Sequence, residues 1–306
     1  MTLYRTDMFE SAQKPKRCPG CGSSRITSII NREQLFHSEA ERNKKQEKII
    51  IESNRKSEVL PAWRCEICKT NIFRTSDFNF SKRVIYFNRN LRFEGSLPRG
   101  IRIMNPFLDN DEVMNTVRLF YEKYYNDNCE RYLILGINPG RFGAGATGVP
   151  FTDTKRLREK CRIEINSFQT HEPSSVFIYE VIDAYGGVKK FYSDFYINSI
   201  CPLGFTAPGK NGKEINYNYY DSRELMTAVY NFIIKSLEEQ LQFPVKRDVC
   251  FCLGTGKNFE FLSRLNNKFH FFQKIITLDH PRYVMQYKSK LKNQYIDKYI
   301  KLLKDK

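Results

Sequence analysis

Apolar runs of strand length recur through the C-terminal three-quarters of the chain, and helical patterns separate them. Residues 132–135, 176–182, 191–200 and 249–254 predict strands, and a last short strand is expected at residues 275–278. Apolar side chains with helical spacing predict helices at residues 111–125 and 225–241. From Val284 the chain is again expected to be helical, with a stripe of core-facing side chains: Tyr287, Leu291, Tyr295 and Tyr299. This alternation indicates an α/β domain.

The strand at residues 132–135 runs into a segment that is unusually rich in glycine. Gly136-Ile137-Asn138-Pro139-Gly140 follows it directly, and Gly143, Gly145 and Gly148 come shortly after. Asn138 is the polar amide of this segment, and Phe151 is the large aromatic residue at its end. Glycines beyond a buried strand let the backbone approach a ligand closely, and parallel sheets bind ligands at this edge. A structural loop remains the alternative to a binding site.

Charge and cysteine usage narrow the class of protein further. The 306 residues carry a formal net charge of +16, which favours a polyanionic partner or an anionic membrane surface. No apolar run reaches transmembrane length, and the N-terminus lacks the apolar core of a signal peptide. The odd number of nine cysteines suits a reducing compartment. We therefore expect a cytoplasmic protein.

Four of the cysteines form two C-x-x-C pairs near the N-terminus. Cys18 and Cys21 make one pair, and Cys65 and Cys68 make the other. Two such pairs complete a tetrahedral shell of four thiolates, which predicts a structural zinc ion with no open position for catalysis. We expect a zinc ribbon-like module over residues 1–75, with strands at residues 26–30 and 48–52 and an elongated hairpin or a helical insertion between the pairs. The module is expected to dock on DNA or on a repair partner.

The glycine-rich segment resembles the first motif of the single-strand-selective monofunctional uracil-DNA glycosylases. That motif reads G-x-N-P-G, followed by F-G and T-G-V-P-F, and all three parts stand in residues 136–151. Arg141 replaces the proline of the best-known members, and the chain is similar to a second, bacterial subgroup of the family. The resemblance covers residues 76–306 and implies a three-layer α/β/α domain with a central, mostly parallel four-stranded sheet. It also implies a monomeric DNA glycosylase that needs no cofactor for catalysis.

Two later segments extend the resemblance. Ile200-Cys201-Pro202-Leu203 resembles the end of the family's base-recognition strand, and His280-Pro281 resembles its last motif. Aligned on Cys-Pro-Leu, the family's asparagine falls on Ser199, with Asn198 one position earlier. We favour Asn198 as the base reader because an amide both donates and accepts hydrogen bonds. A one-residue offset would turn the side chain to the other face of the strand.

The resemblance implies a role for each motif residue. Phe151 would stack on a base flipped out of the duplex, beside Gly140, while His280 would stabilise negative charge on the departing base and Asn138 would orient water. The residues expected to contact DNA are Arg141, Lys155, Arg156, Arg282 and Tyr283, of which Arg282 or Tyr283 would be the wedge. Uracil is the expected substrate and xanthine is plausible. Two alternatives stay open: a non-catalytic zinc-containing nucleic-acid-binding protein, and an α/β enzyme acting on small nucleotides.

Overall fold

The sheet expected from the apolar runs is present as four parallel strands in the order β12-β11-β7-β8. In this computed structural model the described residues are 9–11, 13–18, 21, 23–31, 49–52, 63–67, 71–74 and 78–306. The strands of the sheet are β7 (Arg131–Gly136), β8 (Phe195–Ser199), β11 (Val245–Leu253) and β12 (Lys274–Leu278). Both β7 and β8 are buried along their whole length, which explains why their sequences show no alternation of polar and apolar residues.

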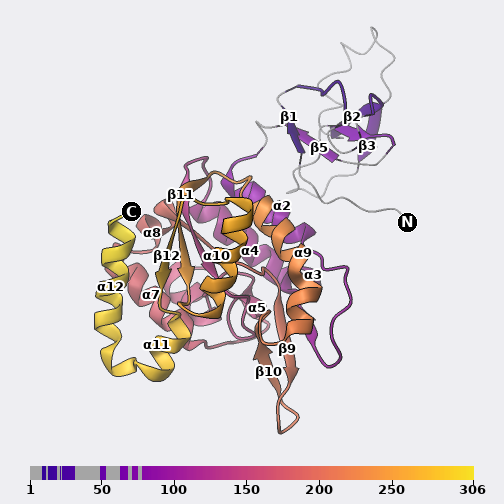
Figure 1. Cartoon of the computed structure of the whole chain (residues 1–306). Coiled ribbons are helices and arrows are strands. Elements are labelled where there is room, and N and C mark those ends of the chain that lie inside the picture. Colours follow the sequence, from indigo (N-terminus) through magenta and orange to yellow (C-terminus); the bar gives the residue numbers. More distant parts are fainter. Residues whose placement is uncertain are drawn as a thin grey trace.

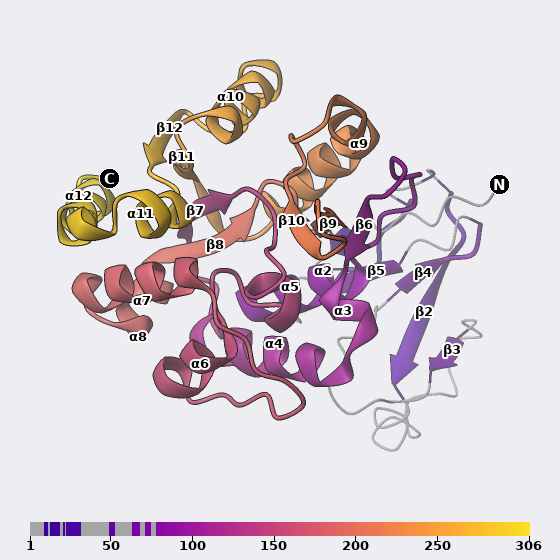
Figure 2. The same cartoon turned by 90° about the horizontal axis from the view of Figure 1, so that it is seen from below.

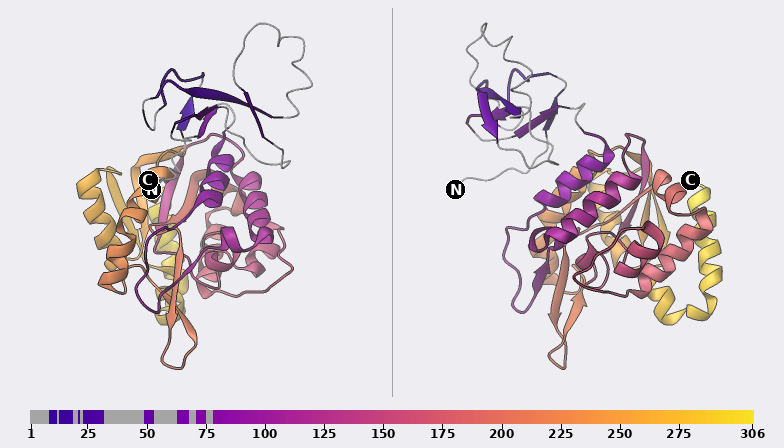
Figure 3. Two further views of the ribbon diagram at one scale, coloured as in Figure 1. Left: turned by 90° about the vertical axis from the view of Figure 1, so that its right-hand side faces the viewer. Right: turned by 180° about the vertical axis from the view of Figure 1, so that it is seen from behind.

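Helices cover both faces of this sheet (Figures 1 and 3). One side carries α7 (Pro173–Tyr185), α8 (Val188–Asp194), α11 (Pro281–Tyr287) and α12 (Lys292–Lys304). The other side carries α2 (Phe80–Asn90), α4 (Asp111–Tyr124), α9 (Arg223–Gln240) and α10 (Lys257–Phe269). Successive residues of β8 show the two sides: the Phe195 ring lies 5.0 Å from Phe191 of α8, and the Tyr196 ring lies 5.2 Å from Phe80 of α2.

Short elements complete this part of the chain. They are β6 (Arg102–Met104), α3 (Pro106–Asp109), α5 (Ala144–Thr147), α6 (Thr154–Arg156), the π-helical turn Leu157–Cys161 and the 3₁₀ turn Ser289–Leu291. Asp153 caps α6 by accepting the backbone N–H of Arg156. Among the described residues, no helix is both long and apolar enough to span a membrane.

The run at residues 176–182 is helical and not a strand, which corrects the sequence prediction. It lies within α7, which starts at Pro173 and is buried on most of its circumference. The helix is enclosed between the sheet and α12, and the Phe177 ring lies 5.2 Å from that of Tyr299 on α12. A helix that is apolar all round loses the period of 3.6 by which helices are recognised. Similarly, only the second half of residues 191–200 is a strand, because the first half belongs to α8.

The predicted stripe of core-facing side chains near the C-terminus is also only partly present. Tyr299 is buried, but Tyr287 is 65% exposed and Leu291 is 43% exposed. The chain is not one continuous helix here, since a 3₁₀ turn separates α11 from α12. The turn changes the angular phase of the side chains, so residues spaced by four along the sequence no longer share one face.

A β-hairpin that the sequence reading did not identify stands beside the main sheet. Its strands are β9 (Gly204–Pro208) and β10 (Glu214–Tyr217), and β6 pairs with β9 to give an antiparallel three-stranded sheet. Gly212 in the connecting turn has φ +74°, and the N–H of Gly209 donates to the carbonyl of Lys213. Figure 2, seen from below, shows this small sheet next to α5, at the carboxyl ends of the main strands.

The described part of the N-terminal segment contains a five-stranded sheet in the order β1-β5-β4-β2-β3. The strands are β1 (Phe9–Ser11), β2 (Ile26–Asn31), β3 (Ile49–Glu52), β4 (Trp63–Cys65) and β5 (Asn71–Arg74). Strands β2 and β3 stand where strands were predicted. They pair in parallel, however, so they cannot be the two arms of one hairpin.

Candidate active site

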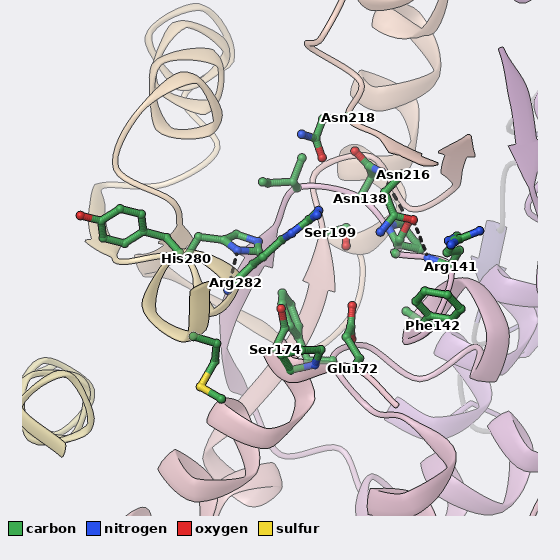
Figure 4. A pocket seen from close by; sticks show the side chains of 18 of the residues that line it. Asn138, Arg141, Phe142, Glu172, Ser174, Ser199, Asn216, Asn218, His280 and Arg282 are labelled. Carbon is green, nitrogen blue, oxygen red and sulfur yellow. Dashed lines mark hydrogen bonds between the residues drawn. The ribbon is translucent and has the colours of Figure 1, made fainter. Parts of the chain in front are cut away.

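A pocket of about 720 Å³ lies beyond the carboxyl ends of β7, β8 and β12 (Figure 4). Five segments that are distant in sequence supply its wall: residues 137–151 after β7, the start of α7, the end of β8, β10 with the turn after it, and α11 with the residue before it. They meet because parallel strands all end at the same edge of the sheet. Asn138, Phe151 and His280 all line this one pocket.

The aromatic wall of the pocket depends on a glycine in the strand end. Ring atoms Cε2 and Cζ of Phe151 lie 3.0 Å from the place where a Cβ on Gly136 would stand. The absence of a side chain at Gly136 therefore lets the ring pack directly on the strand. Phe151 also has φ 51°, which is uncommon for a non-glycine residue. Unusual backbone conformations of this kind are found at functional sites, where surrounding structure maintains them.

The amide of Asn138 is fixed by backbone groups of the segment that follows β10. Its Nδ2 donates to the carbonyl of Tyr217 at 3.2 Å, and its Oδ1 accepts the N–H of Tyr219 at 3.1 Å. These two bonds distinguish the oxygen from the nitrogen, so the amide cannot turn over without losing both. A carbonyl oxygen has a second lone pair, which leaves Oδ1 able to accept a hydrogen bond from a water molecule in the pocket.

His280 follows β12 and caps α11. Its Nδ1 accepts the backbone N–H of Arg282 at 3.2 Å, which places the proton of the neutral ring on Nε2. Burial, together with the positive charge of Arg282, lowers the pKa of His280 from 6.5 to about 4. The ring lies 6.0 Å from that of Phe151, centroid to centroid. His280 is therefore a neutral hydrogen-bond donor at neutral pH, next to the aromatic wall.

On β8 the structure brings Ser199 and not Asn198 to the pocket. Asn198 is 7% exposed, and its amide donates to the hydroxyl of Tyr196 at 2.8 Å while accepting the N–H of Ser199. Side chains two apart on a strand share a face, so Asn198 lies with Tyr196 on the face covered by α2. Our preference for Asn198 is not supported, because the one-residue offset places the residue that aligns with the family's asparagine, Ser199, in the wall.

Polar groups from two unexpected segments also face the pocket (Figure 4). Asn216, on β10, accepts the backbone N–H of Arg141 at 3.0 Å and so joins the hairpin to the loop after β7. Glu172, which precedes α7, points into the pocket. Burial and the charge of Asp153 raise the pKa of Glu172 to about 7, although Arg282 acts in the opposite direction. The run Pro208-Gly209-Lys210-Asn211-Gly212 was a turn signal that could have revealed the hairpin.

The basic residues expected to contact DNA occupy different environments. Arg141, Arg282 and Tyr283 line the pocket, and Tyr283 is 42% exposed at its mouth. Lys155 lies on exposed surface away from the pocket lining. Arg156 has a side chain only 13% exposed, and its guanidinium pairs with buried Asp153 at 3.2 Å. Arg156 therefore has a structural partner that competes with any phosphate.

The four predicted zinc ligands are only partly within the described residues. Cys18 is buried and Cys21 is exposed, while the side chain of Cys65 and all of Cys68 lie outside the residues that the structure describes. Backbone contacts bring the two pairs toward each other. Ile26, shortly after the first pair, is opposite Cys65 in the β2–β4 ladder, and the N–H of Glu66 donates to the carbonyl of Arg25. The four-cysteine site stays a prediction.

The fold and the pocket define a class of protein. A three-layer α/β domain has, at its strand ends, a slot with an aromatic wall, a fixed amide and a neutral imidazole, which is the chemistry of enzymes that act on an exposed nucleobase. Residues 122–304 match the family model of the uracil DNA glycosylase superfamily. The match spans more than half of the chain, so the protein belongs to that superfamily and is a monofunctional DNA glycosylase of base excision repair.

A solved relative supports the same assignment. The crystal structure of SMUG2 from Pedobacter heparinus is 56% identical in sequence and superimposes with a TM-score of 0.73. The match covers 74% of this chain and 98% of that one. A search of curated protein sequences gives no match.

Proposed function

We propose that the pocket receives a deaminated base flipped out of DNA, uracil or xanthine, and that Asn138 and His280 carry out its hydrolytic release. The supporting observation is that a fixed amide and a neutral imidazole, 142 positions apart in the numbering, line one pocket with Phe151. Flipping costs a few kcal/mol of unstacking. Stacking on the Phe151 ring offsets this by about 1–3 kcal/mol per base.

The protonation state of His280 fits the charge that develops in the reaction. Cleavage of the bond between base and sugar leaves a cationic, oxocarbenium-like sugar and an anionic base. Nε2–H of His280 would donate a hydrogen bond to a carbonyl oxygen of the base as that oxygen becomes negative. A neutral donor with a pKa of about 4 stabilises the anion without first having to lose or gain a proton at neutral pH.

The water molecule would be positioned by Oδ1 of Asn138, whose orientation the peptide groups of Tyr217 and Tyr219 determine. An amide is a very weak base, so water would add late, after the bond to the base is largely broken. Bases that leave readily as anions are therefore preferred. No lysine is among the described residues that line the pocket, which agrees with hydrolysis to an abasic site rather than Schiff-base chemistry.

Base release from defined oligonucleotides tests the proposal. The protein would be incubated with duplex and single-stranded oligonucleotides holding one uracil, xanthine or hypoxanthine, and abasic sites would then be cleaved with alkali. We expect wild-type release of uracil and xanthine, and loss of most release in Asn138→Ala with binding nearly intact. Full activity of Asn138→Ala would refute the mechanism, and the comparison of oligonucleotides would establish base and strand preference.

We also propose that the N-terminal segment holds one structural zinc ion on Cys18, Cys21, Cys65 and Cys68, and docks on DNA or on a repair partner of a monomeric, cytoplasmic enzyme. The backbone proximity of β2 and β4 supports this. Elemental analysis should find one zinc per chain, and Cys65→Ser should lose it. Cys129→Ser, at an exposed cysteine outside the module, is the control. Equal metal content in both variants would refute the site, and light scattering would report the oligomeric state.

A further inference from the structure

Glu172 is the one carboxyl group among the described residues of the pocket lining, and two glycines make room for it. A Cβ on Gly140 would lie 2.9 Å from Oε1 of Glu172, and a Cβ on Gly143 would lie 2.0 Å from Oε2. Any side chain at Gly143 would therefore displace the carboxyl group from its position. The loop after β7 is shaped around this carboxyl group as well as around the pocket.

The backbone of Glu172 is fixed by a hydrogen bond, whereas its carboxyl group is available to bind a ligand in the pocket. The N–H of Glu172 donates to Oδ2 of Asp153 at 2.9 Å, which fixes the start of α7. Within the part of the chain that the structure describes, no hydrogen bond to either carboxyl oxygen of Glu172 is present. Figure 4 shows the side chain pointing into the pocket, on the side opposite Asn138 and Asn216.

This position matters once a base is in the pocket. In the proposed pose, a base stacks on Phe151 with one carbonyl oxygen toward His280. Its remaining polar edge, away from the sugar, would then be open to Ser199 and Glu172, both of which line the pocket. Deamination replaces an exocyclic amine by a carbonyl oxygen on that edge. As the base departs, its negative charge spreads onto this oxygen also, so a second hydrogen-bond donor there would add to the effect of His280.

We infer that Glu172, in its protonated form, is a second catalytic donor, whose carboxyl O–H donates a hydrogen bond to the carbonyl oxygen that deamination creates. The proton stays on Glu172 while the bond between base and sugar breaks. This inference rests on the proposed release of a flipped base. An ionised Glu172 would instead place a negative charge beside a departing anion and oppose the reaction.

The surroundings of Glu172 favour the protonated form near neutral pH. Burial is the largest cause of its raised pKa of about 7, and the negative charge of Asp153, which caps α6, adds to it. Arg282 on α11 opposes both effects. His280 is uncharged in this range. Two further groups contact the carboxylate of Asp153, Arg156 at 3.2 Å and His171 at 3.6 Å. Entry of a base would exclude water and raise the pKa of Glu172 further.

The sign of the pH dependence follows. The active form is protonated, so kcat/KM should fall as the pH rises through about 7. The corresponding fall in kcat should come at higher pH, because kcat reports the complex in which the base has displaced water.

Two variants and a matched control test the inference on a uracil oligonucleotide. Glu172→Gln keeps an N–H donor of similar shape, so it should retain activity within roughly tenfold and lose the fall of kcat/KM near pH 7. Glu172→Ala should lose about 10²–10³-fold in the single-turnover rate at pH 6.5. Glu164→Gln, at an exposed carboxylate, should keep the wild-type profile. Melting curves would confirm that each variant is folded.

The outcomes separate this inference from the proposed function. If wild-type protein releases no base, the proposed function fails. If wild-type protein is active, either of two results would overturn the role of Glu172. One is a rate for Glu172→Ala equal to that of Glu164→Gln, and the other is a wild-type pH profile in Glu172→Gln.

Discussion

Replacement of His280 by alanine would separate the proposed catalytic role of its imidazole from its structural role. The side chain makes one structural hydrogen bond, in which Nδ1 accepts the N–H of Arg282 at the start of α11. Loss of a helix cap costs about 0.5–2 kcal/mol of folding free energy. Loss of one donor to a developing oxyanion typically costs about 10²–10³ in rate, or roughly 3–4 kcal/mol of transition-state stabilisation. His280→Ala should therefore be slightly less stable and severely slower.

The assay is single-turnover release of uracil from a labelled oligonucleotide, which excludes slow product release from the measured rate. Glutamine can place an N–H donor near the position of Nε2, so His280→Gln should recover part of the lost rate, although it cannot accept the Arg282 N–H with the same geometry. Anisotropy with labelled DNA should show nearly unchanged binding. A folded His280→Ala variant with a rate within threefold of wild type would refute the argued role of the imidazole.

Three further predictions concern the walls and the mouth of the pocket. Gly136→Ala places a Cβ 3.0 Å from the ring of Phe151, so it should displace the ring and lower uracil release while changing the melting temperature little; unchanged release would show that the ring does not contact the base. Ser199→Ala should lower base release. Asn198→Ala should instead lower the free energy of unfolding by about 1–3 kcal/mol in a denaturant titration, because it removes a buried hydrogen-bond partner. The reverse pattern would mean that Asn198 reads the base. Tyr283→Ala, at the exposed mouth, should weaken binding to duplex more than to single-stranded DNA in anisotropy, and an equal loss on both would argue against a wedge.

The sequence was informative wherever local pattern and tertiary environment agreed. Strands β7, β11 and β12 and helices α4 and α9 were foreseen because their burial follows from their own apolar spacing. Helix α7 was misread because neighbours cover it on both sides, which removes the polar face that marks a helix. The local sequence pattern does not indicate on how many sides a segment will be covered by other helices and strands.

Sequence motifs near strand ends predicted more of the candidate site than the chemistry of individual residues did. Asn138, Phe151 and His280 were found from residues near strand ends, and the structure places all three in one pocket. Glu172 and Asn216 were missed because each reaches the pocket from a segment whose position only the tertiary fold determines. Asn198 and Ser199 are neighbours on β8 and therefore point to opposite faces. The alignment on Cys-Pro-Leu indicated Ser199, but we preferred Asn198 because it carries an amide, and the amide of Asn198 is engaged with Tyr196 instead.

The attachment of Asn138 to the hairpin has a consequence for how this protein can vary. Two peptide groups, at Tyr217 in β10 and at Tyr219 just after it, orient an amide that lies about eighty positions earlier. In the proposed mechanism the end of the hairpin would therefore help to position the hydrolytic water through main-chain atoms. The length of chain between the stem and α9 should therefore stay constant in homologous chains. Tyr219 is constrained by its side chain as well, because it is fully buried and its hydroxyl donates to Asn258 at 2.9 Å. Lengthening the outer loop near Gly212 should leave turnover untouched, whereas a single residue inserted after Tyr217 should abolish it.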